Sequence, residues 1–329
     1  MGYDSNSASW VIGCHFVLTV VWHLLLFAGL APHPTDPDVY ATVGDDCTLR
    51  IWSAEHRRPT HEMAIETMSR AVAWSPSGDY LALGLGGHTR KGRSNKDGSF
   101  LIISASSMLV EHEGRDSREW ITDAKYSPDG KMLALASNDN IIYLYNAEDG
   151  YPLIAKCEKH SASVRHIDFS LNGAYLQSNC TAFELLYFNT SDGVVIFNPS
   201  NLKDEQWASW TCPLGWPVQG IWPEVSDGTN DATCVHKAHS HDVVAVGEEG
   251  GAIKVFKYPA LAKRAATVKG FGYSNAVGNI RFLADDNRLI TISRDSRTIC
   301  QWRVEWPQEP EPEEGFDSDE DEPAGGGAK

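Results

Sequence analysis

Short apolar runs separated by tight turns dominate the chain, and residues 125–146 show this pattern most clearly. Ser127-Pro128-Asp129-Gly130 combines a proline that fixes φ with a glycine that permits positive φ, and Asn138-Asp139-Asn140 supplies a second turn signal. The apolar runs 132–136 and 141–145 each have the length of a buried strand, and the second is rich in β-branched and aromatic residues. This segment is therefore predicted to form three antiparallel strands joined by two hairpins.

The same pattern recurs along the chain at a period of roughly 40–50 residues, which is typical of sheets stacked radially as the blades of a propeller. A turn like Ser127-Pro128-Asp129-Gly130 precedes the second strand in five of six copies. The predicted fold is an all-β propeller with six recognisable blades. The residues that end the third strand of each copy are Trp52, Ile103, Tyr145, Phe188, Phe256 and Trp302.

One copy, residues 44–52, is similar to the signature of WD repeats, in which a turn aspartate bonds the neighbouring hairpin and a tryptophan ends the strand. Asp46 lies in this turn, and Asp139 and Asp295 lie in the equivalent turns, so a structural role is predicted for all three. His160 stands where WD repeats carry a histidine that bonds the turn aspartate, although the glycine that precedes it there is Lys159 here. A structural role is expected for His160 as well.

The chain is predicted to divide into an atypical apolar leader (1–28), one propeller (29–306) and a disordered acidic tail (307–329). Residues 10–31 form an apolar run of membrane-spanning length, but no Lys or Arg precedes it, which disfavours a signal peptide or anchor. The alternative is a buried strand of the first blade. Because six blades leave the closure of the ring open, either the leader supplies a closing strand or the sequence starts late.

The formal net charge of −16 excludes one broad class of function. Nine acids and no bases lie within residues 309–322, and the rest of the chain is acidic as well. A nucleic-acid-binding protein needs a basic face, so no nucleic-acid partner is expected. The seven cysteines are odd in number and show no pairing rhythm, which favours a reducing compartment.

Two segments interrupt the repeats and supply candidate contacts. The loop 86–98 is glycine-rich and basic; it is either a solvated hairpin insertion or a loop that recognises an acidic partner segment or the chain's own tail. The insertion 210–223 is rich in tryptophan and is either a packed aromatic ledge or a partner-binding surface. The candidate partner contacts are Arg90, Lys91, Arg93, Lys96, Trp216 and Trp222.

No metal, cofactor or catalytic residue is predicted. The nearest approach to a metal motif lacks the paired Cys-x2-Cys element of closed zinc sites, and no nucleophile can be matched to a base and an orienting group. The residues of that incomplete motif are Cys212, Cys234, His236, His239 and His241.

Several stretches together resemble the second propeller of the echinoderm microtubule-associated protein-like family, over about residues 29–305. The Trp-Pro pair followed by Ser-Asp-Gly-Thr is the most specific of them, because generic WD repeats lack it. The resemblance implies a role in binding tubulin and microtubules. The stretches are 29–34, 140–145, Trp207 with 211–215, 220–223 with 227–229, and 301–304.

The resemblance implies tandem propellers behind a hydrophobic motif, with an N-terminal coiled coil and a basic region in many members. No coiled coil, basic region, hydrophobic motif or first propeller is recognised in these 329 residues. The favoured function is therefore a non-catalytic interaction scaffold in the cytoplasm, associated with the cytoskeleton through tubulin or other proteins. A membrane-anchored or secreted propeller that uses the N-terminal apolar segment is the main alternative. A propeller enzyme is a third alternative, without a motif to support it.

Overall fold

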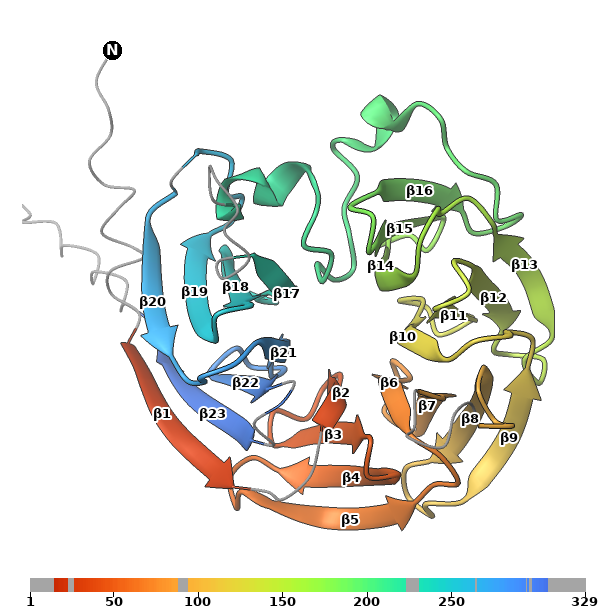
Figure 1. Ribbon diagram of the computed structural model, residues 1–329, viewed down its shortest axis with the longest axis horizontal. Helices are drawn as coiled ribbons and strands as arrows, with labels where there is room; N and C mark the ends of the chain where they lie inside the picture. The colour runs from red at the N-terminus through yellow and green to blue at the C-terminus, as the bar shows by residue number, and fades with distance from the viewer. Residues whose placement is uncertain are drawn as a thin grey trace, which may run out of the picture.

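The computed structural model shows a ring of six β-sheets around a central channel, as the repeat pattern predicts (Figure 1). Each sheet runs outward from the channel, and consecutive strands pair antiparallel. Two short 3-10 helices, η2 (Pro199–Leu202) and η3 (Trp216–Ile221), are the only helices in the described part of the chain. The structure describes residues 15–22, 27–87, 94–222, 231–263, 265–293, 295 and 298–306.

The first three blades have four strands each, which follow one another in chain order from the channel outward. Blade 1 comprises β2 (Phe27–Pro32), β3 (Val39–Gly44), β4 (Thr48–Ser53) and β5 (Arg58–Ala64). Blade 2 comprises β6 (Ser69–Trp74), β7 (Tyr80–Leu85), β8 (Ser99–Ser104) and β9 (Val110–Arg115). Blade 3 comprises β10 (Ile121–Tyr126), β11 (Met132–Ser137), β12 (Ile142–Asn146) and β13 (Leu153–Cys157).

The remaining blades differ from one another in their outer strand. Blade 4 has only β14 (Val164–Phe169), β15 (Tyr175–Cys180) and β16 (Leu185–Asn189). Blade 5 comprises β17 (Ala232–Lys237), β18 (Val243–Glu248), β19 (Ala252–Lys257) and β20 (Thr267–Phe271). Blade 6 comprises β21 (Val277–Phe282), β22 (Arg288–Ser293) and β23 (Thr298–Glu305), and its outer strand is β1 (His15–Trp22).

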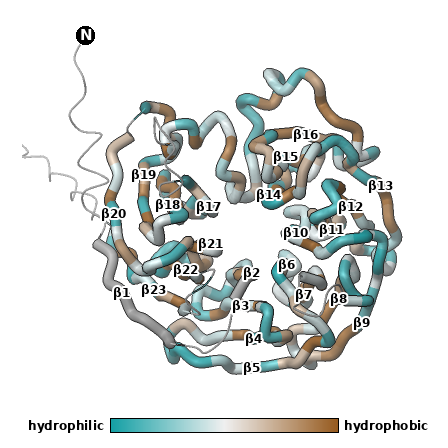
Figure 2. The backbone as a smooth tube through the Cα atoms, in the orientation of Figure 1, coloured by the Kyte–Doolittle hydropathy of each residue, from teal (hydrophilic) through white to brown (hydrophobic). Residues whose placement is uncertain are grey.

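The middle strands are continuously apolar because both faces of each sheet pack against neighbouring blades. In β11, for example, five of six residues are buried, whereas the outer strand β5 is mostly exposed. Figure 2 shows hydrophobic stretches in the strands of each described sheet. The predicted turns also form: Gly130 (φ +76°) and Asn140 (φ +71°) both adopt the left-handed conformation that their turns require.

Residues 15–22 of the N-terminal apolar run close the ring. Strand β1 pairs with β23 over its whole length, from His15 opposite Glu305 to Trp22 opposite Thr298, and β2 begins the first blade. The described structure thus corresponds to the alternative in which the leader completes the closing blade. Within the described residues there is no helix long and apolar enough to cross a membrane.

The segment between the end of β16 (Asn189) and the start of β17 (Ala232), called the insertion below, separates blades 4 and 5 at the top of the view in Figure 1. On one side, the amide of Ala208 donates to the carbonyl oxygen of Phe169 at the end of β14 (3.0 Å). On the other side, the amide of Lys237 in β17 donates to the carbonyl oxygen of Trp210 (3.1 Å). Residues 207–212 therefore stand between two inner strands that would otherwise be neighbours.

Candidate interaction face at the central cavity

A cavity of about 880 Å³ opens at the end of the channel where the inner strands begin. All six blades and the insertion contribute to its wall. Loops and strand ends on a rigid scaffold are where propellers and other folds commonly place binding groups, so this face is the first candidate for function. Lining residues from successive parts of the ring include Asp45, Arg70, Asp123, Arg165, Phe183, Trp222, Asp231 and Arg281.

Each inner strand shifts its register once, near its start, and this repeated bulge shapes the cavity wall. A bulge leaves one residue without a partner on the adjacent strand and re-aims its side chain. In two blades the extra residue is a threonine that bonds the next inner strand: Thr122 Oγ1 donates to the carbonyl oxygen of Val164 and Thr233 Oγ1 to that of Val277, both at 2.6 Å. The extra residues are Ala28, Arg70, Thr122, Arg165, Thr233 and Gly278.

Charged groups of both signs line the cavity. Arg70 forms a bidentate ion pair with Asp45 of the neighbouring blade, with Nε and Nη2 at 3.0 and 2.9 Å from the two carboxylate oxygens. The carboxylate of Asp123 accepts the amide of Ile167 at 3.1 Å, and burial raises the pKa of this carboxyl. Each of these two contacts connects a carboxylate in one blade to a group in the adjacent blade.

An exposed aromatic side chain stands at the mouth of the cavity. Phe183 lies in the turn between β15 and β16, is 67% exposed and has a φ of +59°. Its ring meets that of Trp222 edge to face at 6.2 Å, and Trp222 is fixed by a bond from Nε1 to the carbonyl oxygen of Pro213 (3.0 Å). A bulky residue held in the left-handed region costs free energy, which points to a use for the exposed ring.

Neither Phe183 nor Asp168, which positions this rim, is predicted from the sequence. Asp168 is fully buried in β14 and accepts four hydrogen bonds shorter than 3.2 Å from the insertion. One feature of the sequence could have identified Asp168: it is an acidic residue between two apolar residues, Ile167 and Phe169, in a predicted inner strand. The donors are Ser209 Oγ (2.5 Å), Thr211 N (2.7 Å), Thr211 Oγ1 (2.9 Å) and Cys212 N (3.1 Å).

Comparison with known proteins places this arrangement in a family. Residues 27–304 match the family model described as the echinoderm microtubule-associated protein second beta-propeller. The chain belongs to the echinoderm microtubule-associated protein-like family. The match covers the cavity, the bulged inner strands and the insertion.

Three curated relatives illustrate the likeness. Echinoderm microtubule-associated protein-like 1 of Rattus norvegicus is 34% identical over 279 residues, 84% of this chain and 33% of the relative. Echinoderm microtubule-associated protein-like 2 of Homo sapiens is 31% identical over 292 residues, 88% of this chain and 43% of the relative. The 77 kDa echinoderm microtubule-associated protein of Strongylocentrotus purpuratus is 33% identical over 296 residues, 89% of this chain and 41% of the relative. The chain thus spans less than half the length of each.

In this EMAP-like propeller the turn aspartates make different contacts. Asp46 bonds within its own hairpin, to Thr48 and to Arg50 Nη1 at 2.7 Å, and it is Asp45 that reaches the neighbouring blade through Arg70. The sequence pattern placed this inter-blade contact one residue too late. Asp295 lines the cavity, and its amide donates to Ser293 Oγ at 3.3 Å.

Asp139 connects its turn to the segment before β10. Its carboxylate accepts hydrogen bonds from Ser117 Oγ (2.9 Å), the amide of Arg118 (3.1 Å) and the hydroxyl of Tyr143 (2.8 Å). Ser117 thus occupies the place that the WD pattern gives to a histidine.

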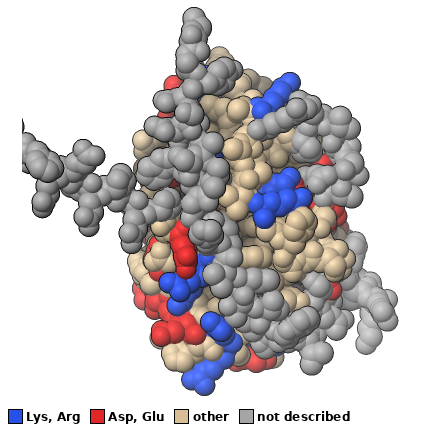
Figure 3. Space-filling view, turned by 90° about the vertical axis from the view of Figure 1, so that its left-hand side faces the viewer, with Lys and Arg blue, Asp and Glu red and all other residues tan. Residues whose placement is uncertain are grey.

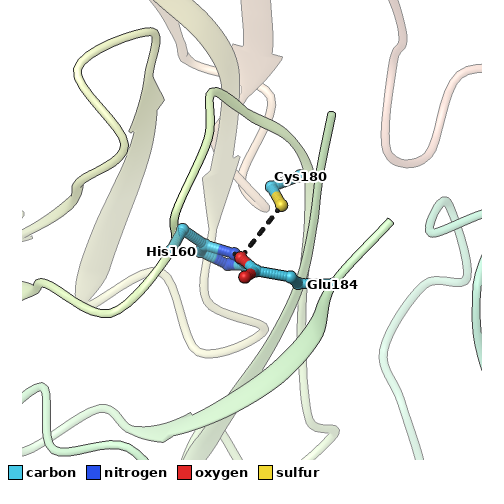
Figure 4. Close-up of side chains that lie close together, drawn as sticks. All are labelled: His160, Cys180 and Glu184. Carbon is cyan, nitrogen blue, oxygen red and sulfur yellow. Dashed lines mark hydrogen bonds and ion pairs between the residues drawn. The ribbon is translucent and has the colours of Figure 1, made fainter. Parts of the chain in front are cut away.

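His160 contacts a glutamate where the WD pattern has an aspartate (Figure 4). Its Nδ1 lies 3.3 Å from Glu184 Oε2 and its Nε2 lies 2.7 Å from Ser178 Oγ. Glu184 also accepts the amide and hydroxyl of Ser161 and the thiol of Cys180, and these bonds, those from Ser161 first, lower its pKa to about 2. Glu184 in this way joins the turn of blade 4 to the strand connection before it.

The same cluster is one of two groups of described residues whose ligand atoms are close enough to hold a metal ion. Burial raises the pKa of the Cys180 thiol, so the sulfur is protonated at neutral pH and donates to Glu184 rather than serving as a thiolate ligand. The other group is Asp38, Glu55 and His56, in which Asp38 already accepts from Ser53 and Glu55. The expectation of no metal stays a prediction.

The cysteines and histidines of the incomplete zinc motif do not come together as a metal-holding group among the described residues. His239 and His241 instead place Nδ1 at 2.8 and 3.4 Å from the buried carboxylate of Asp286. His236 Nδ1 accepts the amide of Phe282 (3.1 Å) and links blades 5 and 6.

The remaining candidate contacts fall in different places. Arg90, Lys91 and Arg93, like the acidic tail, lie outside the described residues. Lys96 forms ion pairs within its own chain, with Glu66 at 3.3 Å and Glu113 at 2.5 Å. Trp216 is 45% exposed on η3 but does not line the cavity, whereas Trp222 does. On the side of the ring shown in Figure 3, the described acidic and basic side chains are interspersed.

The half-buried His166 in the cavity wall predicts a loss of stability in mild acid. Burial, and then the charges of Arg281 and Lys125, lower the pKa of His166 from 6.5 to about 3. The unfolded chain therefore takes up the proton first as the pH falls, so the stabilisation is present above pH 6.5 and is lost below it. Between pH 7 and pH 5 this one residue is expected to cost about 2 kcal/mol of unfolding free energy.

Urea unfolding of the native chain and of His166→Asn at the two pH values measures this effect. The variant should lose about 2 kcal/mol less than the native chain between pH 7 and pH 5. His61→Asn is the matched control, because His61 is exposed on the outer strand β5. Equal pH slopes for the native chain and His166→Asn would show that His166 titrates normally.

Proposed function

We propose that the chain is a non-catalytic interaction scaffold that associates with tubulin or microtubule assemblies at the cytoskeleton in the cytoplasm. The observation that carries the proposal is the match of residues 27–304 to the second propeller of the family, whose curated relatives are named as microtubule-associated. A propeller presents loops on a rigid ring, which suits the docking of a protein partner.

The chemistry of the cavity supports a binding role rather than a catalytic one. His166 and Cys180 are its candidate base and nucleophile. The pKa of His166 is lowered to about 3 by burial, and the thiol of Cys180, whose pKa is raised by burial, donates to Glu184. A nucleophile needs an adjacent base that activates it, and no such pair is formed by these two residues.

The rim formed by Phe183 and Trp222 is the contact surface that we assign to the partner. An exposed aromatic ring backed by a second, hydrogen-bonded aromatic ring has the character of an interface anchor. The positive φ of Phe183 is a cost to the free protein, since a glycine or asparagine would be more stable there. A phenylalanine at this position therefore favours a role in binding over a role in stability.

Replacing Phe183 by glycine is therefore expected to weaken partner binding without lowering the free energy of unfolding. The free energy of unfolding should stay the same or rise by up to about 1 kcal/mol, because backbone strain is relieved. Binding to tubulin dimers or microtubules should weaken by about 2 kcal/mol, roughly 30-fold in Kd, because an anchor is lost. Co-sedimentation over a range of tubulin concentrations, with denaturant unfolding in parallel, measures both quantities.

Phe197→Ala is the matched control, because Phe197 is 82% exposed on the same blade but does not line the cavity. It should bind as the native chain does. If the native chain, Phe183→Gly and Phe197→Ala bind equally well, Phe183 is not part of the interface. If the native chain does not bind tubulin or microtubules, the tubulin proposal is overturned.

A further inference from the structure

The outer half of blade 5 is basic, although the protein as a whole is acidic. Residues 250–284 contain no Asp or Glu, whereas the full chain has a formal net charge of −16. This stretch includes β19 and β20, which are the two outer strands of blade 5. Lys257 at the end of β19 and Lys263 in the connection to β20 are both exposed. This part of the surface is therefore suited to an acidic ligand.

Two exposed apolar side chains lie on neighbouring segments of the same surface. Trp216 is 45% exposed on η3, and Leu261 is 58% exposed in the connection between β19 and β20. Two backbone hydrogen bonds of 2.7 Å hold η3 against this connection (Figure 1): the amide of Ala260 donates to the carbonyl oxygen of Pro217, and that of Gly220 donates to the carbonyl oxygen of Ala260. The four residues called the outer patch below are Trp216, Lys257, Leu261 and Lys263.

The described part of the chain ends close to the outer patch. Trp306, its last residue, stacks on the ring of His241 in blade 5, with the ring centroids 3.7 Å apart and an interplanar angle of 3°. The carbonyl oxygen of the next residue, Asp242, accepts the amide of Tyr258 at 2.8 Å. Leu261 follows Tyr258 by three residues, so it lies within roughly 20 Å of His241. The tail that follows Trp306 therefore starts beside blade 5.

The composition of the tail complements the outer patch. Nine acids and no bases lie within residues 309–322, and Phe316, the only aromatic residue of 307–329, stands among these acids. The ten residues from 307 to 316 can span at most about 35 Å, which exceeds the separation of the patch from His241. The exposed carboxylate of Asp242 opposes the attraction, but the two lysines of the patch outnumber it. Phe316 can therefore reach the patch together with its acidic neighbours.

We propose that the outer patch docks the acidic tail of the same chain, with Phe316 against Trp216 and Leu261 and the acids of 309–322 near the two lysines. An aromatic ring gains from apolar and aromatic neighbours, and opposite charges attract within a Debye length of about 10 Å. A short tether holds the tail at an effective concentration in the millimolar range, so even a weak contact suffices. The docking does not depend on the proposed tubulin association.

Limited digestion of the full chain with a glutamate-specific protease tests the docking, because a docked tail is shielded from the protease. Mass spectrometry follows cleavage after Glu320, four residues beyond Phe316. Leu261→Ala leaves the tail sequence unchanged, and its tail should be cleaved about threefold faster than that of the native chain, as for a native tail docked roughly two-thirds of the time. Added sodium chloride should speed cleavage of the native tail, because it screens the attraction to the lysines.

A double variant shows whether Phe316 and Leu261 touch each other. Phe316→Ala alone should also raise the cleavage rate about threefold, and Phe316→Ala with Leu261→Ala should be cleaved no faster than either single variant, because both remove the same contact. Leu109→Ala is the matched control, because Leu109 is 65% exposed but belongs to blade 2. Its tail should be cleaved at the native rate.

Lys263→Gln serves as a second variant if Leu261→Ala lowers the free energy of unfolding, and Lys131→Gln, at an exposed lysine of blade 3, is its control. Lys263→Gln should raise the cleavage rate about twofold and Lys131→Gln should not. Cleavage of Leu261→Ala, Lys263→Gln and Phe316→Ala at the native rate would overturn the docking. Protection that rises with protein concentration would also overturn it, because the tail would then be bound by a second copy of the chain.

Discussion

Replacing Asp168 by alanine is expected to lower the free energy of unfolding by about 3–5 kcal/mol. The carboxylate is fully buried and accepts hydrogen bonds from Ser209, Thr211 and Cys212. Without it, two buried amides and a buried hydroxyl lose their acceptor, and each unsatisfied group costs about 1–3 kcal/mol. The insertion would then lose its main attachment to β14.

Denaturant unfolding and limited proteolysis of residues 199–222 measure the two parts of this effect. Asp204→Ala is the matched control, because Asp204 lies in the same insertion and is exposed. The variant Asp168→Ala should be cleaved faster in this segment, and the control should behave as the native chain does. If Asp168→Ala unfolds at the native denaturant concentration, the insertion is held mainly by its tryptophans.

Removing residues 1–22 is expected to lower the free energy of unfolding by about 4 kcal/mol, and the Tm by about 10 °C. The deletion eliminates β1, which pairs with all eight residues of β23. Cross-strand pairs contribute up to about 1 kcal/mol each, and the deletion also exposes the edge of β23, which promotes association between chains.

A variant that lacks only residues 1–14 keeps β1 and is the control for shortening the chain. Calorimetry and light scattering of the two deletions give stability and association together. If the shorter deletion is as destabilising as the longer one, the pairing of β1 with β23 is not what stabilises the ring.

Local signals in the sequence were enough to predict the blades. The turn that ends in Gly130, with positive φ, and the apolar runs on either side require only neighbouring residues to be recognised. The pairing of β1 with β23 is different, because it joins segments almost 300 residues apart and no turn chemistry connects them. Hydrophobicity alone could not decide between a strand and a membrane segment for residues 10–31.

The site was harder to predict than the fold. Trp222 was found because tryptophans crowd in the insertion, but Phe183 is a single aromatic in a turn and gives no periodic signal. Placing the inter-blade contact on Asp46 instead of Asp45 shows how a shift of one residue in a turn changes the partner.

The closure of the ring by β1 also determines how the molecule responds to tension. His15 pairs with Glu305, so the outer ends of the two strands lie at the same end of their ladder. A force that pulls these two ends apart loads the hydrogen bonds one pair at a time, beginning at His15 and ending at Trp22. The pairing of β1 with β23 would therefore unzip rather than shear. It would break at a lower force than an arrangement in which the force loads all eight pairs together.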